Sequence, residues 1–221
     1  MNTCYKNYLK LKFSKIYKGL IIISVLVILI IGVFILRYYY IHTNYSHDNK
    51  QELELKYWEC KSKIVDEIEE YINKKVKYYN ISILVMLNAC DKYDIDIRLP
   101  LSQGYLESRY GTVGLARRTN SVFNMGAFDG NSLDKVLNIY KYSHPNQSIE
   151  PYLFKLRNNY LGTTKTEKDL LIEFVTLGGA RYASYNKYER ELQLIWEDID
   201  TTTNLDSLLN LYQFLKLELD R

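Results

Sequence analysis

Glu107 is the residue of this sequence whose surroundings best suit acid–base chemistry. It lies in the stretch LSQGYLESRYG, residues 101–111, directly after two apolar residues. A carboxyl group in apolar surroundings loses hydration, which raises its pKa and lets it hold a proton near neutral pH. A protonated carboxyl group of this kind can act as the general acid in the cleavage of a glycosidic bond.

The spacing around Glu107 adds a second feature. Residues three and four apart share a helix face, so Glu107 is expected to lie with Gln103 and Gly104. Glycine costs a helix about 1 kcal/mol relative to alanine. We interpret Gly104 as an opening where a ligand could approach the backbone beside Glu107. The alternative is that Glu107 is an ordinary solvated helix residue beside Arg109.

Other catalytic chemistries find little support in the sequence. The three histidines, His42, His47 and His144, are scattered, and none has a second histidine or a cysteine at metal-ligand spacing. There is no nucleophile elbow, phosphate loop or dinucleotide fingerprint, so neither a metal nor a cofactor is expected. Neither Cys60 nor Cys90 has the context of a nucleophile. Carboxylates therefore remain as the candidate catalytic groups.

Three ordered blocks resemble the peptidoglycan N-acetylglucosaminidase domain, also described as mannosyl-glycoprotein endo-beta-N-acetylglucosaminidase-like, within the lysozyme-like superfamily. The blocks cover roughly residues 80–195. They are LSQGYLESRYG, then Leu115-Ala116 with NSVFNM from Asn120, and finally RYASYNKYEREL with Tyr182 and Tyr188. The first block supplies the family's Gln, Leu-Glu-Ser and Gly as Gln103, Leu106, Glu107, Ser108 and Gly111.

The resemblance implies roles for individual residues. Glu107 would donate the proton to the leaving oxygen, and Tyr182 would line the site and help to stabilise charge near the reacting sugar. Asn120 and Phe123 would shape the loop beneath, although both also suit an ordinary turn and core. Gln103 could equally be a packing residue. The residues expected to bind substrate are Gln103, Arg109, Tyr110, Asn120, Phe123, Asn124 and Tyr185.

A second carboxylate is less clearly marked. Asp129, in the turn sequence AFDG, is the first candidate for a second catalytic group, and Glu150 is a weaker one. An exposed turn aspartate is the plainer interpretation of Asp129. Enzymes that resemble this family can also use the acetamido group of the substrate, so hydrolysis does not require a second acid.

The sequence departs from the family pattern at three positions. Arg109 replaces a glycine, Tyr110 replaces a tryptophan, and Asn124 stands at another glycine position. Asparagine tolerates positive φ better than most residues, so the turn at Asn124 should persist. Arg109 could alter sugar binding, or pair with Glu107 and lower its pKa, which would harm a general acid.

The function implied is a peptidoglycan hydrolase that cleaves the glycan backbone as an N-acetylglucosaminidase, with glycan strands as its partner. Two alternatives stay open. One is a lytic transglycosylase of the same superfamily, and the other is a catalytically impaired wall-binding or assembly protein.

An uncharged apolar run, Gly19 to Leu36, predicts a membrane anchor. At 1.5 Å per residue, 18 helical residues span about 27 Å, close to the bilayer core of about 30 Å. Lysines precede the run, which predicts a cytoplasmic N-terminus, and three tyrosines follow as an interfacial belt. A buried core helix or a cleaved signal peptide fits less well, because the run is apolar on every face and no small-residue cleavage site follows. We expect an uncleaved, single-pass signal anchor in the cell membrane, with the rest of the chain outside the cytoplasm.

The charge distribution argues against nucleic-acid binding. Six of the 29 Lys and Arg residues lie before residue 48, where no acidic residue occurs. The rest of the chain contains the other 23 basic residues and all 26 acidic residues, so its net charge is slightly negative. A nucleic-acid-binding domain would show the reverse.

The expected fold is mainly α, a lysozyme-like helical domain preceded by one transmembrane helix. The expected organisation is a basic tail at 1–18, the anchor at 19–40, a polar linker (41–50) with a stalk or first helix to 79, and the domain at 80–221. Apolar periodicity and caps predict helices at 51–79, 80–93, 101–109, 132–142, 149–160, 167–177, 187–198 and 204–219. A small β-hairpin could form at GAFDGNS, residues 126–132, and Thr166 with Asp169 fits a capping box.

Cys60 and Cys90 would both lie outside the cytoplasm and could pair in a disulfide, or they could simply be buried in helices.

Overall fold

The computed structural model describes residues 3–125 and 141–221, and within the first helix it describes the side chains of residue 24, residues 27–39 and those from residue 49 onward. The helices are α1 (Thr3–Lys75), α2 (Ile83–Tyr93), α3 (Arg98–Ser108), α4 (Ala116–Thr119), η2 (Pro145–Ser148), α5 (Ile149–Lys155), η3 (Leu156–Leu161), α6 (Glu167–Ile172), α7 (Tyr188–Thr202) and α8 (Leu205–Leu219). The mainly helical class expected from the sequence is therefore confirmed.

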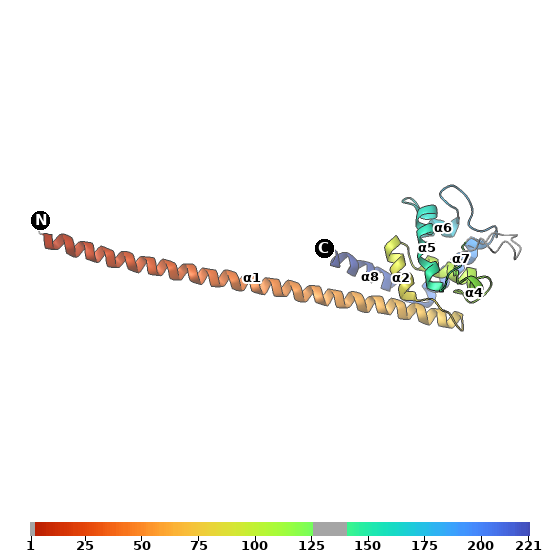
Figure 1. Cartoon of the computed structure of the whole chain (residues 1–221), viewed down its shortest axis with the longest axis horizontal. Helices are drawn as coiled ribbons and strands as arrows, with labels where there is room; N and C mark the ends of the chain where they lie inside the picture. Colours follow the sequence, from red (N-terminus) through yellow and green to blue (C-terminus); the bar gives the residue numbers. More distant parts are fainter. Residues whose placement is uncertain (1–2, 126–140) are drawn as a thin grey trace. The chain divides into compact units, whose positions relative to one another are not determined.

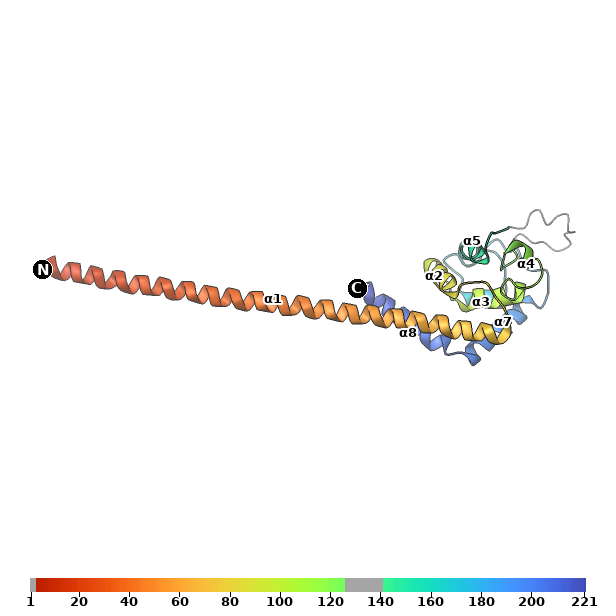
Figure 2. The same ribbon diagram turned by 60° about the horizontal axis from the view of Figure 1, so that its bottom comes forward.

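The chain divides into two compact units. One comprises Met1–Lys56 with Glu218–Arg221, and the other comprises Tyr57–Leu217. Both views in Figures 1 and 2 show α2, α4, α5 and α7 gathered in the second unit. Within this unit α3 packs chiefly against α7, and α2 packs against α5. The second unit therefore contains every helix that can position Glu107.

The last part of α1 belongs to the core of the second unit. Ile64, Ile68 and Ile72 are fully or almost fully buried, at the four-residue spacing that the sequence predicts for a helix face. The Tyr57 ring stacks on Tyr212 of α8 with 5.0 Å between centroids, and the Cys60 thiol donates to the Leu208 carbonyl at 3.4 Å. This end of α1 and α8 thus pack as neighbours, as the two views also show.

Local signals in the sequence account for several helix ends. Ser82 caps α2 by accepting a hydrogen bond from the Val85 N–H at 3.3 Å. The capping box at Thr166 and Asp169 is confirmed, with both reciprocal hydrogen bonds present. Each polar side chain satisfies an N–H group that would lack a partner within its helix.

Other boundaries differ from the sequence expectation. Residues 41–50, expected as a linker, lie within α1. The helix expected at 167–177 ends at Ile172, because the Phe174 N–H bonds the Glu189 carboxylate and Val175 forms an isolated antiparallel bridge with Arg181. Beyond that bridge, residues 3–125 and 141–221 contain no β-strand. The hairpin expected at 126–132 lies outside the described residues, as does most of the helix expected at 132–142.

Two further expectations concern the anchor and the cysteines. Among the residues whose side chains are described, no helix is long and apolar enough to span a membrane. Part of the expected anchor, residues 19–23, 25, 26 and 40, lies outside them. Of the two alternatives for Cys60 and Cys90, the structure contains buried free thiols and not a disulfide.

Gly104 does not open a path to the backbone, which corrects the expectation from the sequence. A Cβ atom added at this position would lie 3.3 Å from Tyr110 Cδ1, 3.3 Å from Val122 Cγ1 and 3.5 Å from Phe123 Cε1. Gly104 is itself buried. The glycine therefore allows three side chains to close tightly on α3.

We expect Gly104→Ala to lower the free energy of unfolding by about 1–3 kcal/mol, because the added methyl group overpacks the Tyr110–Val122 contact. Urea denaturation of the full chain measures this change. Gly178→Ala is the matched control: its Cβ would meet only the Thr176 hydroxyl, at 3.8 Å, and the change should stay within about 0.5 kcal/mol. Equal effects at the two positions would contradict the packing argument.

Candidate active site

The chain reverses direction immediately after Glu107. Arg109, Tyr110 and Gly111 have φ values of +49°, +58° and +86°. The Tyr110 N–H donates to the Gly104 carbonyl and the Arg109 N–H donates to the Tyr105 carbonyl, both at 2.9 Å. Such bonds are typical of an α-helix that ends at a residue in the left-handed (αL) conformation. Arg109 thus occupies a conformation that favours glycine, which explains physically why the family pattern has glycine there.

Ser108 fixes this reversal to the following loop. Its hydroxyl is buried, donates to the Val122 carbonyl at 2.6 Å and accepts from the Gly111 N–H at 2.7 Å. Asn124, in the same loop, has φ +47°, so the positive φ predicted for this asparagine is confirmed. The last turn of α3 is therefore held at a fixed distance from the segment that carries Asn124.

The Glu107 carboxylate is partly buried and receives hydrogen bonds from two other elements. The Tyr188 hydroxyl of α7 donates to Glu107 Oε1 at 2.9 Å. The Asn124 amide donates to the Glu107 backbone carbonyl at 2.8 Å and lies 3.4 Å from Oε2. These bonds orient the carboxyl group.

Gln103 stands one helical turn before Glu107 and contacts the same tyrosine. Gln103 is fully buried, and its Nε2 donates to the Tyr188 hydroxyl at 3.0 Å. We refer to Gln103, Glu107, Asn124, Tyr182 and Tyr188 as the Glu107 cluster. The resemblance assigns a role to Tyr182, whereas the tyrosine that donates to the Glu107 carboxylate is Tyr188. The sequence pointed to Tyr188 only as another tyrosine of the block RYASYNKYEREL.

Tyr182 and Tyr188 form an aromatic wall beside the carboxylate. Their ring centroids lie 5.4 Å apart, and both rings contact Phe174. The Tyr182 hydroxyl donates to the Phe123 carbonyl at 3.1 Å. Burial first, and then neighbouring negative charge that includes Glu107, raises the pKa of both Tyr182 and Tyr188 well above the usual value. Both phenols therefore remain protonated donors at neutral pH.

Arg109 and Tyr110, two departures from the family pattern, have different surroundings. The exposed Arg109 guanidinium lies 4.0 Å above the centroid of the Tyr105 ring, so a cation–π contact occupies it. Tyr110 is fully buried, with its ring centroid 5.7 Å from that of Tyr105.

The remaining predicted site residues are spread over the domain. Phe123 is fully buried and stacks on Tyr152, with 3.7 Å between centroids. Asn120 ends α4 with φ +53°, and its amide donates to the Tyr142 carbonyl at 2.8 Å. Tyr185 is exposed and donates to Glu191 at 2.8 Å. Glu150 is exposed and paired with Lys92, and Asp129 lies outside the described residues.

Glu189 anchors the segment that carries Tyr182. Its carboxylate accepts from the Phe174 N–H at 3.2 Å and from Arg181 Nη2 at 2.7 and 2.9 Å. The Tyr182 N–H in turn bonds the Phe174 carbonyl at 2.9 Å. Burial opposes ionisation of Glu189, but these hydrogen bonds and the Arg181 charge outweigh it, so its pKa lies below the usual value.

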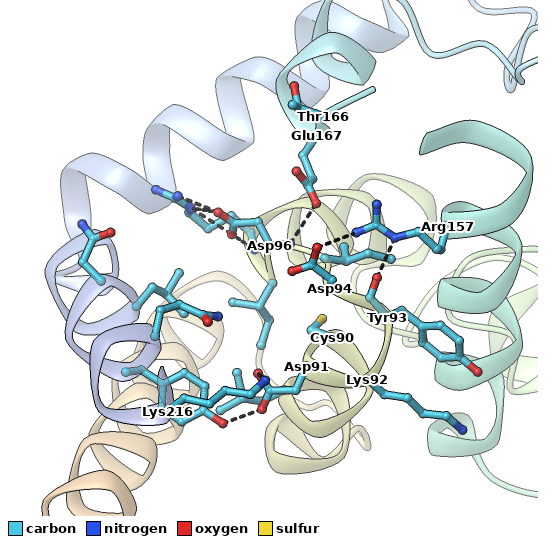
Figure 3. Close-up of a pocket in the computed structure, with 18 of the residues that line it drawn as sticks. Cys90, Asp91, Lys92, Tyr93, Asp94, Asp96, Arg157, Thr166, Glu167 and Lys216 are labelled. Carbon is cyan, nitrogen blue, oxygen red and sulfur yellow. Dashed lines mark hydrogen bonds and ion pairs between the residues drawn. The ribbon is translucent and has the colours of Figure 1, made fainter. Parts of the chain in front are cut away.

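A separate concave region lies on other residues of the same unit. This pocket has a volume of about 770 Å³. It is lined by the end of α2, the α2–α3 connection, Arg157 with the η3–α6 connection, the start of α6 and one face of α8 (Figure 3). None of the Glu107 cluster lines it. Its charged groups are largely paired: Arg98 bridges Asp96 at 2.6 Å and Asp200 at 2.8 Å, and Asp91 accepts from Tyr212.

A helical domain that holds one partly buried carboxyl group among tyrosine hydroxyls has the components of a glycoside-cleaving enzyme. The family model described as mannosyl-glycoprotein endo-beta-N-acetylglucosaminidase matches residues 85–201, more than half of the chain. The chain belongs to this glucosaminidase family and is a glycoside hydrolase. The matched range contains the whole Glu107 cluster.

Among solved structures, the chain is similar to the catalytic domain of the autolysin Auto from Listeria monocytogenes. The identity is 24% and the TM-score is 0.40, and the match covers 53% of this chain and 80% of that one. No curated protein sequence matches significantly.

We expect Glu189→Gln to lower the free energy of unfolding at pH 7 by about 1–2 kcal/mol, since an ionised acceptor is lost. A lowered folded-state pKa contributes stability above the unfolded pKa, and this contribution disappears as the pH falls through the folded value. The difference from the wild type should therefore shrink below about pH 4. Hydrogen exchange at the Phe174 and Tyr182 amides should accelerate in the variant.

Glu197→Gln, an exposed substitution on the same helix, is the control for this experiment and should change neither property. A stability difference for Glu189→Gln that is unchanged at pH 3 would argue against an ionised Glu189 as the anchor.

Proposed function

We propose that this protein hydrolyses the glycan backbone of peptidoglycan as an N-acetylglucosaminidase, with Glu107 as the general acid. The observation that carries the proposal is the environment of the Glu107 carboxyl group. It lies in the last turn of α3, inside the range matched by the family model, and Tyr188 and Asn124 hold it in one orientation.

In the proposed reaction Glu107 donates its proton to the glycosidic oxygen while the bond between that oxygen and the sugar carbon breaks. An oxocarbenium-like centre develops at the sugar, and a water molecule adds to it and releases a proton. Tyr182, next to Tyr188, is proposed to line the site and help to stabilise the developing charge.

Two groups could assist the attack on the oxocarbenium-like centre. Asp129 is the first candidate on the chain, and the acetamido group of the substrate is the alternative. Both Asp129 and the acetamido group are compatible with Glu107 as the single proton donor to the glycosidic oxygen. The Arg109 guanidinium lies over the Tyr105 ring and is exposed, where solvent and salt screen its charge.

The apolar run Gly19–Leu36 supports the further proposal that the enzyme is anchored in the cell membrane. With the lysines of residues 1–18 in the cytoplasm, the Glu107 cluster would lie on the outer side, where peptidoglycan is found. A tether would confine cleavage to glycan strands close to the membrane.

We expect the purified full chain in detergent to clear a zymogram that contains cell walls. Glu107→Gln should reduce clearing by about 10²–10⁴-fold, because the amide cannot donate the required proton. Glu67→Gln serves as the matched control, since this carboxylate also accepts a hydrogen bond, from the Asn204 N–H, but lies on α1. Equal clearing by the wild type and Glu107→Gln would refute the assigned acid.

Mass spectrometry of the released glycan separates the proposed hydrolase from a lytic transglycosylase. Hydrolysis should leave new reducing ends with the mass of one added water, whereas a transglycosylase leaves anhydro ends. Glycan binding without turnover at any pH would instead indicate a wall-binding protein.

We expect the full chain to remain with the membrane fraction after an alkaline carbonate wash. The double variant Ile28→Lys/Ile31→Lys should move into the soluble fraction, because each charge near the centre of a spanning helix costs about 2.5–3.5 kcal/mol. Tyr39→Lys, at the interfacial end of the run, is the control and should stay with the membrane. Release of the wild type by the wash would contradict the anchor.

A further inference from the structure

The hydrogen bonds around Tyr188 have a defined direction. The Tyr188 hydroxyl has one proton, and its oxygen lies 3.0 Å from Gln103 Nε2 and 2.9 Å from Glu107 Oε1. An amide N–H can only donate, so Gln103 occupies a lone pair of the phenol oxygen. The Tyr182 hydroxyl also interacts with Tyr188, but a carboxylate is the stronger acceptor, so the phenol proton is directed to Glu107.

The two donors belong to a rigid part of the unit. Gln103 is 0% exposed and Tyr188 is 4% exposed. Gln103 and Glu107 stand four residues apart on one face of α3, and Tyr188 enters from the first turn of α7. Since α3 and α7 pack against each other, the fold itself brings the three groups together.

We propose that Tyr188, oriented by Gln103, is a positioning residue that stabilises the negative charge left on Glu107 when its proton moves to the leaving oxygen. This inference rests on the proposed function, because it requires Glu107 to be the general acid.

The stabilisation depends on the state of the reaction. While Glu107 holds its proton, the carboxyl group is neutral and gains little from a phenol donor. As the proton leaves, the carboxylate forms, and a hydrogen bond to an ionised acceptor is roughly twice as strong as one between neutral groups. An interaction that strengthens towards the transition state accelerates the chemical step, whereas uniform binding does not.

The other titratable groups near Glu107 among the described residues leave this role to Tyr188. Tyr182, from the segment before α7, donates to the Phe123 carbonyl. Tyr152 of α5 is buried against Phe123, and Arg109 lies over the Tyr105 ring. Burial, together with the nearby negative charge, raises the pKa of Tyr152 and Tyr182, so both remain neutral.

Tyr188→Phe tests the proposal in the full chain in detergent, with soluble glycan strands as the substrate. We expect kcat to fall about 10–100-fold while KM changes less than twofold, a smaller loss than for a donor that contacts the reacting atoms directly. Loss of a donor to the carboxylate favours its protonated form, so the basic limb of the kcat/KM profile should move to higher pH. A purely structural role for Tyr188 would not shift that limb.

Tyr71→Phe is the matched control. Tyr71 is also a buried tyrosine that donates to a carboxylate, Asp198, at 2.7 Å, but it lies on α1. Each substitution removes one hydrogen bond between a buried tyrosine and a carboxylate, so both variants should have a lower thermal unfolding temperature. Tyr71→Phe should nevertheless keep the kcat and the pH profile of the wild type.

Gln103→Leu provides a second route if Tyr188→Phe folds poorly. It should reduce kcat about 3–10-fold, because without the Gln103 donor the Tyr188 hydroxyl can rotate and its proton need not point to Glu107. In the Tyr188→Phe background it should cause no further loss, because Gln103 acts through Tyr188.

The outcomes separate the two proposals. Activity retained by Glu107→Gln overturns both. Loss of activity in Glu107→Gln, together with wild-type kcat and pH profile in Tyr188→Phe, overturns the role of Tyr188 alone. Additive effects of the Gln103 and Tyr188 substitutions would overturn the orientation of Tyr188 by Gln103.

Discussion

The end of α3 constrains everything that surrounds Glu107. Three successive residues with positive φ turn the chain away within one helical turn of the carboxylate, and the Tyr110 side chain then folds back against Gly104. Non-glycine residues in this conformation cost about 1–3 kcal/mol each, and they persist only where surrounding contacts compensate. The buried Ser108 hydroxyl, bonded to Val122 and to the Gly111 N–H, supplies such contacts.

This arrangement fixes the position of the Glu107 carboxylate at the end of α3. Because α3 stops at Ser108, Glu107 is in the last turn, within reach of Asn124 from the next loop and Tyr188 from α7. A longer helix would carry the chain past both partners. Arg109 has the left-handed backbone conformation, which costs free energy in a residue other than glycine. The contact between its guanidinium and the Tyr105 ring offsets part of this cost.

Local rules predicted the parts of this structure that depend on local sequence. The capping box at Thr166 and Asp169, the helix at 204–219 and the positive φ of Asn124 all follow from residue type and spacing. Gly104 was misinterpreted, because only the folded core places Tyr110 and Val122 against it. Glu107 could be chosen from its motif, whereas its partner could not, since Tyr182 and Tyr188 lie six residues apart in one block and the packing of α7 decides which hydroxyl meets the carboxylate. The helix through 41–50 likewise overrode a polar composition that predicts a linker.

The two buried thiols of the second unit bear on how this enzyme reaches its native state. Cys60 and Cys90 are 3% and 2% exposed, and burial raises the pKa of each, which lowers the fraction of reactive thiolate. Neither thiol of the folded unit forms a disulfide, so disulfide formation, a step that takes seconds to hours in other proteins, is not part of this fold. Burial of the apolar core, and not a covalent cross-link, therefore holds these two cysteines in place.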